Sequence, residues 1–392
     1  MKKLLLTLGI LLLLAAEILQ VYFIMPFPGS QKANTLRIAY YLHNYVFYIR
    51  LLAAALILAG LAGTFNRWKR GARLAFGLFI VLYGILFYMV NFRFLADTMF
   101  YQPKNKLLAT VSDNRVTSDK LVVGVTLNNQ SKAYPIEIIG YHHQVQDTIG
   151  GEPVMITYCT VCRTGRVYSP FVNGKKESFR LVGMDHFNAL FEDHTSKSWW
   201  RQVNGEAVTG PLKGQSLREI PSQQVSLAVW MRMHPNTLVM QPDTIYKKNY
   251  ADLTGFDNGT IKGSLEHRDT GSWQFKSWIV GVTWHKKSRA YDWNELRSKR
   301  VINDSLPQLS LVLVLEPDTV SYHAWNRVVN NQSLEFYIDN NTLKDRTTNS
   351  VWNFNGVCIL GPMSGQELKP VQASQEFWHS WQTFHPETSI YK

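Results

Sequence analysis

The two cysteines of Cys159-Thr160-Val161-Cys162 are the side chains of this sequence best suited to chemistry. Two thiols separated by two residues can close a small disulfide ring or bind one metal ion, because both sulfurs converge. Arg163 follows directly, and its positive charge would favour the thiolate, which is the nucleophile in thiol–disulfide exchange. The motif therefore predicts a redox-active dithiol. Cys159 would attack, Cys162 would resolve the mixed disulfide, and Arg163 would stabilise the thiolate.

Histidines upstream of the motif offer a second kind of site. His142 is the candidate proton shuttle for the redox reaction. In an alternative interpretation, Cys159 and Cys162 bind copper or zinc together with His142 or His143, and soft thiolates would favour Cu(I). In a third interpretation, the chain is a non-catalytic envelope module and the disulfide only pins a loop. Covalent haem attachment is excluded, because Arg163 stands where a histidine would have to follow.

The elements that would position the cysteines are mainly β. Val154–Tyr158 is a short apolar run that ends just before the motif, and Leu121–Leu127 is a similar run rich in β-branched residues. Asn173-Gly174 predicts a hairpin turn. Apolar residues at helical spacing predict short helices at Leu227–Met233 and Trp378–Phe384. We expect an α+β soluble region dominated by antiparallel sheet.

An internal repeat organises this soluble region. Val122–Tyr134 returns as Ile279–Tyr291, and the Asn-Gly, Gly-Pro and His-Pro steps of the first copy return in the second. Two copies are enough for one pseudo-symmetric domain or for two packed ones. The second copy has Glu316-Pro317-Asp318-Thr319 where the first has its cysteines. Features of the first copy alone, including His142 and His143, are therefore the candidates for function.

Three apolar runs precede the soluble region: Leu4–Ile24, Tyr45–Phe65 and Leu74–Val90. Each is about long enough to cross the hydrocarbon core of a bilayer. A cleaved signal peptide competes for the first run, but no A-x-A site follows it and it is longer than a typical h-region. Arg50 lies inside the second run, and we expect its long side chain to snorkel to the interface. The sequence predicts three transmembrane helices, with the lipid bilayer as a partner.

Positive charge is concentrated beside these runs. Residues 1–100 hold 10 Lys and Arg against 2 Asp and Glu, whereas the other 292 residues hold 31 against 27. The clusters before the first run and between the second and third predict an N-terminus inside the cell. We therefore expect a multi-pass protein of the cytoplasmic (inner) membrane with an extracytoplasmic, periplasmic domain, where disulfides are tolerated. The same uneven distribution argues against nucleic acid as a partner.

The residues around the cysteines resemble the DUF3179 family, a domain of unknown function. The resemblance rests on the motifs Val122–Pro135, Asp147–Gly151 and Ile156–Gly165, and it continues to His234-Pro235. It implies an extracytoplasmic or membrane-anchored protein. In some members selenocysteine replaces the first motif cysteine, which implies redox chemistry at Cys159. The family often has Trp-His-Glu in place of Tyr141-His142-His143 and Gly in place of Arg163, so the resemblance implies no role for His143 or Arg163.

The expected organisation is a membrane domain at 1–95, a first repeat at 96–240, a connecting segment at 241–277 and a degenerate second repeat at 278–392. Cys358 lies in an apolar stretch of the second repeat and is expected to be a small core residue. The expected function is that of a membrane-anchored extracytoplasmic protein with a redox-active CxxC motif. It is a candidate thiol–disulfide oxidoreductase, whose partner would be a protein or a small-molecule thiol.

Overall fold

The computed structural model describes residues 1–392, and the chain divides into two compact units. Unit 1 comprises residues 1–101 and 177–216, and unit 2 comprises residues 102–176 and 217–392. Residues 177–216 therefore belong with the N-terminal helices, whereas the sequence predicts one repeat over the whole range 96–240. Residues 177–216 belong to this unit because they pack on the ends of its helices, through the contacts given below.

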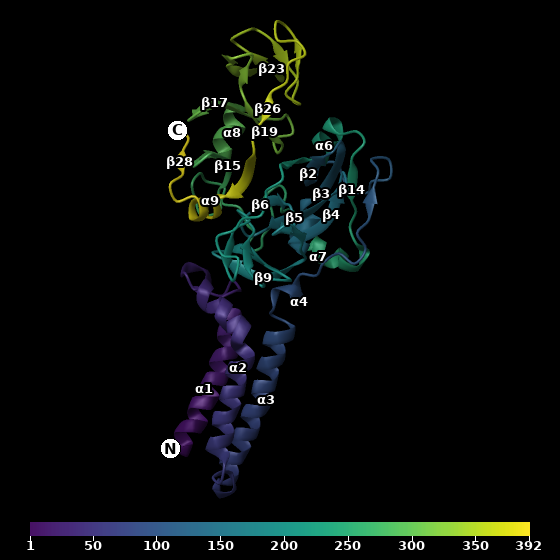
Figure 1. The fold of residues 1–392 in the computed structure, drawn as a ribbon. Helices are drawn as coiled ribbons and strands as arrows, with labels where there is room; N and C mark the ends of the chain where they lie inside the picture. The colour runs from purple at the N-terminus through teal and green to yellow at the C-terminus, as the bar shows by residue number, and fades with distance from the viewer. The chain divides into compact units, whose positions relative to one another are not determined.

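Unit 1 contains three long apolar helices that run side by side: α1 (Lys2–Tyr22), α2 (Leu36–Leu61) and α3 (Arg70–Phe92) (Figure 1). Each is long and apolar enough to cross a membrane, as the sequence predicts. Helix α2 begins before the predicted apolar run at Tyr45. Its first turns carry Tyr40, whose ring meets the ring of Trp199 edge-on at 5.2 Å.

Arg50 does not reach out to an interface, so the expectation that it snorkels is wrong. Its guanidinium forms an ion pair with the fully buried carboxylate of Glu17 on α1 at 2.7 Å. It also donates to Oδ1 of Asn91 on α3 at 2.8 Å. A charge inside an apolar bundle is stabilised by an opposite charge on a neighbouring helix, and a polar partner removes the need to reach water.

A four-stranded antiparallel sheet completes unit 1, in the order β12 (Ala207–Thr209), β11 (Trp199–Arg201), β10 (Asn188–Asp193) and β9 (Phe179–Asp185). The amide of Met184 on β9 donates to the carbonyl of Ile24, just after α1, at 2.9 Å. Arg180 pairs with Asp97 on the short helix α4 (Ala96–Met99) at 3.1 Å. These bonds attach the sheet to the ends of the helices.

The first half of unit 2, defined as residues 102–176 and 217–251, contains two sheets. The larger has the order β1 (Leu108–Ala109), β14 (Leu238–Met240), β3 (Gln130–Pro135), β2 (Leu121–Leu127) and β13 (Gln223–Ser226). The smaller is an antiparallel meander of β4 (Gln144–Ile149), β5 (Glu152–Cys159) and β6 (Thr164–Tyr168). Helices α5 (Ile136–His142), α6 (Leu227–Met233) and α7 (Lys247–Ala251) complete this half, together with the hairpin β7 (Phe171–Val172) and β8 (Lys175–Lys176).

The second half of unit 2, residues 278–392, is built from three four-stranded sheets and one hairpin. The first sheet has the order β27 (Ala373–Phe377), β15 (Trp278–Trp284), β16 (Lys287–Asp292) and β28 (Ser389–Ile390). The second has the order β17 (Val301–Leu306), β18 (Leu309–Leu315), β19 (Tyr322–Asn326) and β26 (Lys369–Pro370). The third has the order β22 (Phe336–Asp339), β23 (Thr342–Asp345), β24 (Val351–Trp352) and β25 (Cys358–Leu360). The hairpin consists of β20 (Val328–Val329) and β21 (Gln332–Ser333). Helices α8 (Trp293–Lys299) and α9 (Trp378–Phe384) accompany these sheets.

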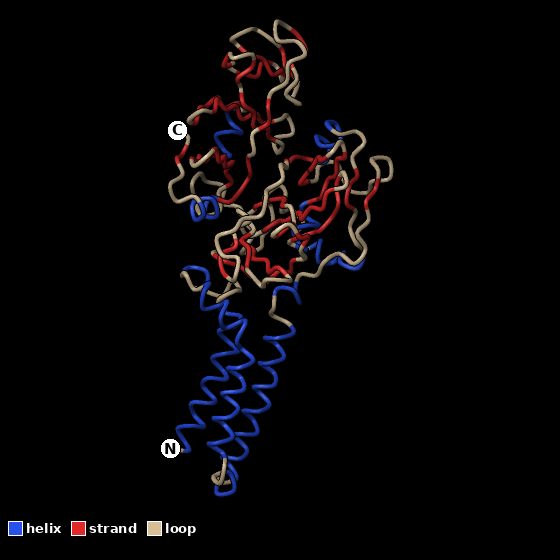
Figure 2. The backbone as a smooth tube through the Cα atoms, in the orientation of Figure 1, coloured by secondary structure: helices blue, strands red, loops and turns tan.

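The expected mainly antiparallel soluble region is confirmed (Figure 2). Only the pairs β3–β14 and β16–β28 are parallel. Strand β2 and helices α6 and α9 have the predicted bounds, and Asn173-Gly174 forms the turn between β7 and β8 with positive φ at both residues. The connecting segment 241–277 contains α7 and the 3₁₀ turn η3 (Thr244–Tyr246).

Aromatic rings packed against glycines shape the core of unit 2. A Cβ atom at Gly124 on β2 would overlap the ring of Trp230 on α6, and a Cβ atom at Gly281 on β15 would overlap Trp381 on α9. Both tryptophans are almost fully buried. Cys358 is buried in an apolar cluster with Trp352 and Leu343, as expected for a small core residue.

Candidate functional site

The CxxC motif forms the turn of the β5–β6 hairpin in unit 2. Cys159 is the last residue of β5 and pairs with Thr164, so the CxxC turn comprises this closing pair and residues 160–163 between them. The amide of Arg163 donates to the carbonyl of Thr160 at 3.3 Å, and Arg163 closes the turn with φ of 55°. Because Val154–Tyr158 of β5 is buried along its whole length, the sheet fixes the base of this turn.

Both sulfurs of the motif lie inside the protein. Cys159 is 2% exposed and Cys162 is 0% exposed, and both carry thiols. The two cysteines lie in one short turn, as the spacing predicts. A large partner would reach them only if the turn moved.

The second half of unit 2 holds this turn through two hydrogen bonds to its backbone. The amide of Phe377 on β27 donates to the carbonyl of Cys162 at 2.9 Å. Nε2 of His379 on α9 lies 3.1 Å from the carbonyl of Val161, which requires the proton on Nε2. Burial lowers the pKa of His379 to about 4, so this imidazole is neutral at pH 7 and donates one hydrogen bond here. No sequence pattern around His379 or Phe377 points to the cysteines.

Arg163 bonds the CxxC turn to the second half of unit 2 and to the connecting segment. Its guanidinium donates to Oε1 of Gln375 at 3.0 Å and to the carbonyls of Phe256 and Asp257 at 2.9 Å each. It also lies over the ring of Trp278, 3.7 Å from the ring centroid. Burial lowers the pKa of this guanidinium, and the carbonyl oxygens satisfy its donors. None of these contacts is to a sulfur atom, whereas the sequence predicts that Arg163 stabilises a thiolate.

Lys276 is a cation in electrostatic range of Cys162. Burial lowers the pKa of its ammonium, and the charges of Glu266, Asp269 and Cys162 oppose that change. Its Nζ donates to the carbonyls of Ser264 and Leu265 at 2.8 and 2.6 Å. Sequence reasoning missed Lys276, because it lies far along the chain in the connecting segment and no pattern around it points to the cysteines.

The two histidines named from the sequence lie at the C-terminal end of α5, which packs against β5. Nε2 of His142 lies 2.8 Å from the hydroxyl of Tyr250, and its ring contacts the rings of Tyr141 and Tyr246. Nδ1 of His143 lies 2.7 Å from the carbonyl of Gly140. Burial lowers the pKa of His143 to about 4, which makes it neutral at pH 7.

A metal centre does not fit these residues. No group of three or more His, Cys, Asp or Glu side chains is arranged so that it could hold a metal ion. A copper or zinc site of the expected kind needs Cys159, Cys162 and at least one histidine to converge.

Comparison with known proteins supports the resemblance drawn from the motifs. The family model described as "Protein of unknown function (DUF3179)" matches residues 102–388, which is more than half of the chain and includes both halves of unit 2. No significant match is found among curated proteins or among solved structures. The chain therefore belongs to the DUF3179 family.

Proposed function

We propose that this protein is a membrane-anchored extracytoplasmic protein whose Cys159–Cys162 pair is a redox-active dithiol. The observation that carries the proposal is the placement of both cysteines in a single hairpin turn, with Cys159 paired to Thr164 across its base. Thiols two residues apart in one turn are favourably spaced to form a disulfide without moving a distant segment. The nearby positive charge of Lys276 favours the loss of the Cys162 proton, which the second step of the reaction requires.

The proposed reaction is exchange with a disulfide of a partner protein or small molecule. The Cys159 thiolate attacks one sulfur of the partner disulfide, the partner S–S bond breaks, and the partner's second sulfur leaves as a thiolate that takes up a proton. Cys162 then loses its proton and attacks the Cys159 sulfur, which releases the partner's first sulfur. The cysteine pair is oxidised to a disulfide and the partner disulfide is reduced to two thiols. His142 is the proposed proton shuttle.

The burial of both sulfurs limits how this exchange proceeds. The turn is held by Phe377 and His379, which bond the carbonyls of Cys162 and Val161. We propose that these two contacts open before a protein partner reacts. A small-molecule disulfide needs a smaller opening, so it is expected to react faster than a folded protein.

A reduction potential provides the direct test. The full-length protein in detergent is equilibrated with glutathione buffers, and the reduced fraction is read by mass after thiol alkylation. A redox-active pair is expected between about −120 and −270 mV, the range of thiol–disulfide oxidoreductases. Cys358→Ser is the matched control, because it removes a buried thiol of the second half and leaves the motif intact.

Trapping of a partner gives a second readout. Cys162→Ser removes the resolving thiol, so a mixed disulfide between Cys159 and the partner is expected to accumulate and to disappear on reduction. Cys358→Ser is expected to trap nothing. A potential outside the catalytic range together with no trapped species would refute the redox function.

Burial also favours a second candidate, a non-catalytic module in which a Cys159–Cys162 disulfide pins the turn. Fully buried structural disulfides typically have potentials below about −300 mV. Under this alternative, Cys159→Ser and Cys162→Ser lower the melting temperature equally and trap no partner. The same two experiments therefore separate the candidates.

The internal repeat is proposed to record a gene duplication that built unit 2 and the sheet of unit 1. Hairpins β2–β3 and β15–β16 have the same register, with Thr126 opposite Ser131 and Thr283 opposite Ser288. Matching hydrogen bonds recur at the predicted spacing: Tyr134–Asp147 and Tyr291–Asp304 at 2.7 Å, and Trp230–Thr237 and Trp381–Thr388 at 2.8 Å. Under this proposal, only the first copy kept the cysteines.

We further propose that the N-terminus lies inside the cell and that unit 2 lies outside the cytoplasm. The proposal rests on Lys2, Lys3 and the basic loop between α2 and α3, which share one side of the membrane and lie on the cytoplasmic side only in that orientation. Alkaline phosphatase, which is active only outside the cytoplasm, is expected to be active when fused after residue 392. It is expected to be inactive when fused within the loop between α2 and α3. Activity of the loop fusion together with inactivity of the fusion after residue 392 would show the opposite orientation.

A further inference from the structure

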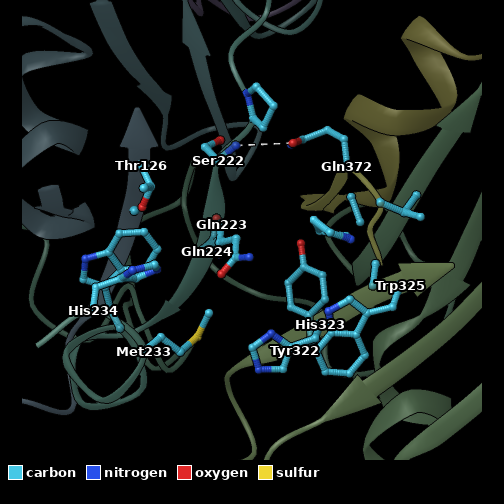
Figure 3. Close-up of a pocket in the computed structure, with 17 residues that line it drawn as sticks. Thr126, Ser222, Gln223, Gln224, Met233, His234, Tyr322, His323, Trp325 and Gln372 are labelled. Carbon is cyan, nitrogen blue, oxygen red and sulfur yellow. Dashed lines mark hydrogen bonds between the residues drawn. The ribbon is translucent and has the colours of Figure 1, made fainter. Parts of the chain in front are cut away.

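A cavity of about 330 Å³ lies between the two halves of unit 2, away from the residues of the CxxC turn (Figure 3). Strands β2 and β13 and helix α6 line it on one side, and β19 with the β26–β27 segment lines it on the other. Its size is in the range of pockets that take small molecules, roughly 300–1,000 Å³. Nothing in the proposed redox function uses it.

Flat side chains face each other across this cavity. On one side, the imidazole of His234 lies against the ring of Trp230, with 4.1 Å between ring centroids and the two planes tilted by 46°. On the other side, His323 stacks on Trp325 at 4.8 Å with their planes 9° apart. Figure 3 shows His234 opposite the group of Tyr322, His323 and Trp325. Such walls favour a flat, unsaturated ligand.

Hydrogen bonds behind these walls hold the rings in place. Nε1 of Trp230 donates to Oγ1 of Thr237 at 2.8 Å. Nε2 of His323 lies 2.6 Å from a carboxylate oxygen of Glu316, and Arg232 binds both oxygens of that carboxylate at 2.6 and 2.9 Å. A ligand would therefore meet walls that are already ordered, which reduces the entropy lost on binding.

The lining carries no Asp, Glu, Lys or Arg side chain. Burial lowers the pKa of His234, so this imidazole is neutral at pH 7. An ion that entered would lose its water without gaining an opposite charge. These features select a ligand without net charge.

One polar group of the lining lacks a partner. Oε1 of Gln223 is buried and accepts no hydrogen bond. Rotation of the Gln223 side chain would bring this oxygen into the cavity, where a ligand N–H or O–H group would satisfy it. Its neighbours Ser222 and Gln372 are bonded to each other across the cavity, from the amide of Ser222 to Oε1 of Gln372 at 3.3 Å (dashed line in Figure 3), so they already have partners.

We propose that this cavity binds a neutral, flat aromatic small molecule that donates a hydrogen bond to Gln223. The ring lies between the His234–Trp230 pair and the His323–Trp325 pair. The class includes aromatic amides and heterocycles that carry an N–H group.

Three related probes test each part of the proposal by ligand-observed NMR on the full-length protein. Nicotinamide is flat, neutral and carries N–H donors. Nicotinate keeps the ring but is charged and lacks the donor, and cyclohexanecarboxamide keeps the amide but lacks the aromatic ring. Nicotinamide is expected to bind, and the other two are expected to bind at least tenfold more weakly. Equal binding of all three, or no binding of nicotinamide, would overturn the proposal.

Variants locate the binding. Thr126→Trp places an indole at the mouth of the cavity from an exposed position, and it is expected to weaken nicotinamide binding at least tenfold. Thr283→Trp is the matched control, because Thr283 is also exposed and opposite a serine but does not line the cavity. Gln223→Leu removes the unpartnered acceptor and is expected to weaken binding about tenfold without filling the mouth. Unchanged affinity in Thr126→Trp and Gln223→Leu would place the binding elsewhere and refute the site.

Discussion

The side-chain Nε2 of Gln224 on β13 donates to Oε1 of Gln375 on β27 at 2.9 Å. Each glutamine lies on the strand that pairs with the long central strand of its own half, β2 or β15. If unit 2 arose by duplication, this bond joins two equivalent residues, and the approximate two-fold axis passes between them. The same Oε1 accepts from Nε of Arg163 at 3.0 Å, so the CxxC turn is attached to the centre of the contact between the halves.

Arg163→Lys is predicted to destabilise unit 2. A lysine ammonium cannot reproduce the planar group that donates to Gln375, Phe256 and Asp257 together, and it leaves buried carbonyls without donors. The expected loss is about 2–4 kcal/mol, because buried hydrogen bonds to charged groups are worth about 1.5–3 kcal/mol each and some re-form. The melting temperature of the purified chain measures it.

Arg268→Lys is the matched control for this prediction. Arg268 also lies over the ring of Trp278, 4.0 Å from its centroid, but it makes a single side-chain hydrogen bond, to Asn294. The expected change is below about 1 kcal/mol. Equal effects of the two substitutions would mean that the ring contact, rather than the carbonyl bonds, gives Arg163 its importance.

Gly124→Ala and Gly281→Ala are predicted to destabilise the protein to a similar extent. Each new Cβ would overlap the tryptophan of the adjacent helix, Trp230 or Trp381, and force it to move. Overpacking of this kind costs about 1–3 kcal/mol. Thermal unfolding of the two variants measures the cost at each site.

The control for the glycine variants is Gly84→Ala on α3, where a Cβ meets no atom within 4 Å. Alanine is a better helix former than glycine, so this change is expected to be neutral or slightly stabilising. If Gly124→Ala were destabilising and Gly281→Ala neutral, the two halves would not be packed in the equivalent way that duplication implies.

Glu17→Gln is predicted to weaken the three-helix bundle. Both oxygens of Glu17 bind Arg50 at 2.7 Å, and Tyr83 and Asn91 of α3 also donate to this carboxylate. Removing one partner of a buried pair leaves an uncompensated charge and costs about 3–5 kcal/mol. A lower temperature of aggregation in detergent is the expected result.

The double variant Glu17→Leu/Arg50→Leu tests whether the uncompensated charge of Arg50 causes the loss of stability in Glu17→Gln. Replacing both members of a buried ion pair with apolar residues removes the unpaired charge, so the double variant is expected to be more stable than Glu17→Gln. A double variant that is less stable than Glu17→Gln would show that the ion pair contributes more than it costs in desolvation.

Local sequence patterns predicted much of the fold, because the length and hydrophobicity of a segment favour one kind of element. The long apolar runs of α1, α2 and α3 and the short β-branched run of β2 are each recognisable from the residues of one element alone. Arg50 was mispredicted because its partner Glu17 lies on another helix, and helix pairing cannot be deduced from one helix.

The surroundings of the candidate site were less predictable. The sequence identified Cys159 and Cys162, whose spacing is local, and the structure places both in one turn. It could not identify Lys276, His379 or the carbonyl partners of Arg163. These contacts come from the packing of segments far apart in the chain, and a backbone carbonyl carries no residue-type signal at all.

Asp257 is predicted to make the stability of unit 2 depend on pH. Its Oδ2 accepts from the amide of Leu121 at 2.9 Å, while its buried Oδ1 has no partner. Burial raises the pKa of this carboxyl to about 6, above its ordinary value of 3.8. Between about pH 4 and 6 the folded state therefore holds more protons than the unfolded state, so the stability falls as the pH rises through this window. Above pH 6 the ionised carboxylate costs about 3 kcal/mol, the equivalent of the pKa difference.

Asp257→Asn removes the titrating group and keeps an acceptor for Leu121. It is expected to match the natural protein at pH 4 and to be more stable by up to about 3 kcal/mol at pH 7, measured by denaturant unfolding at each pH. Asp252→Asn, an exposed change in the same segment, is expected to shift stability by less than about 0.5 kcal/mol at any pH. If the advantage of Asp257→Asn were the same at pH 4 and pH 7, the buried carboxyl would not be the source of the pH dependence, and its unpartnered oxygen would be tolerated for another reason.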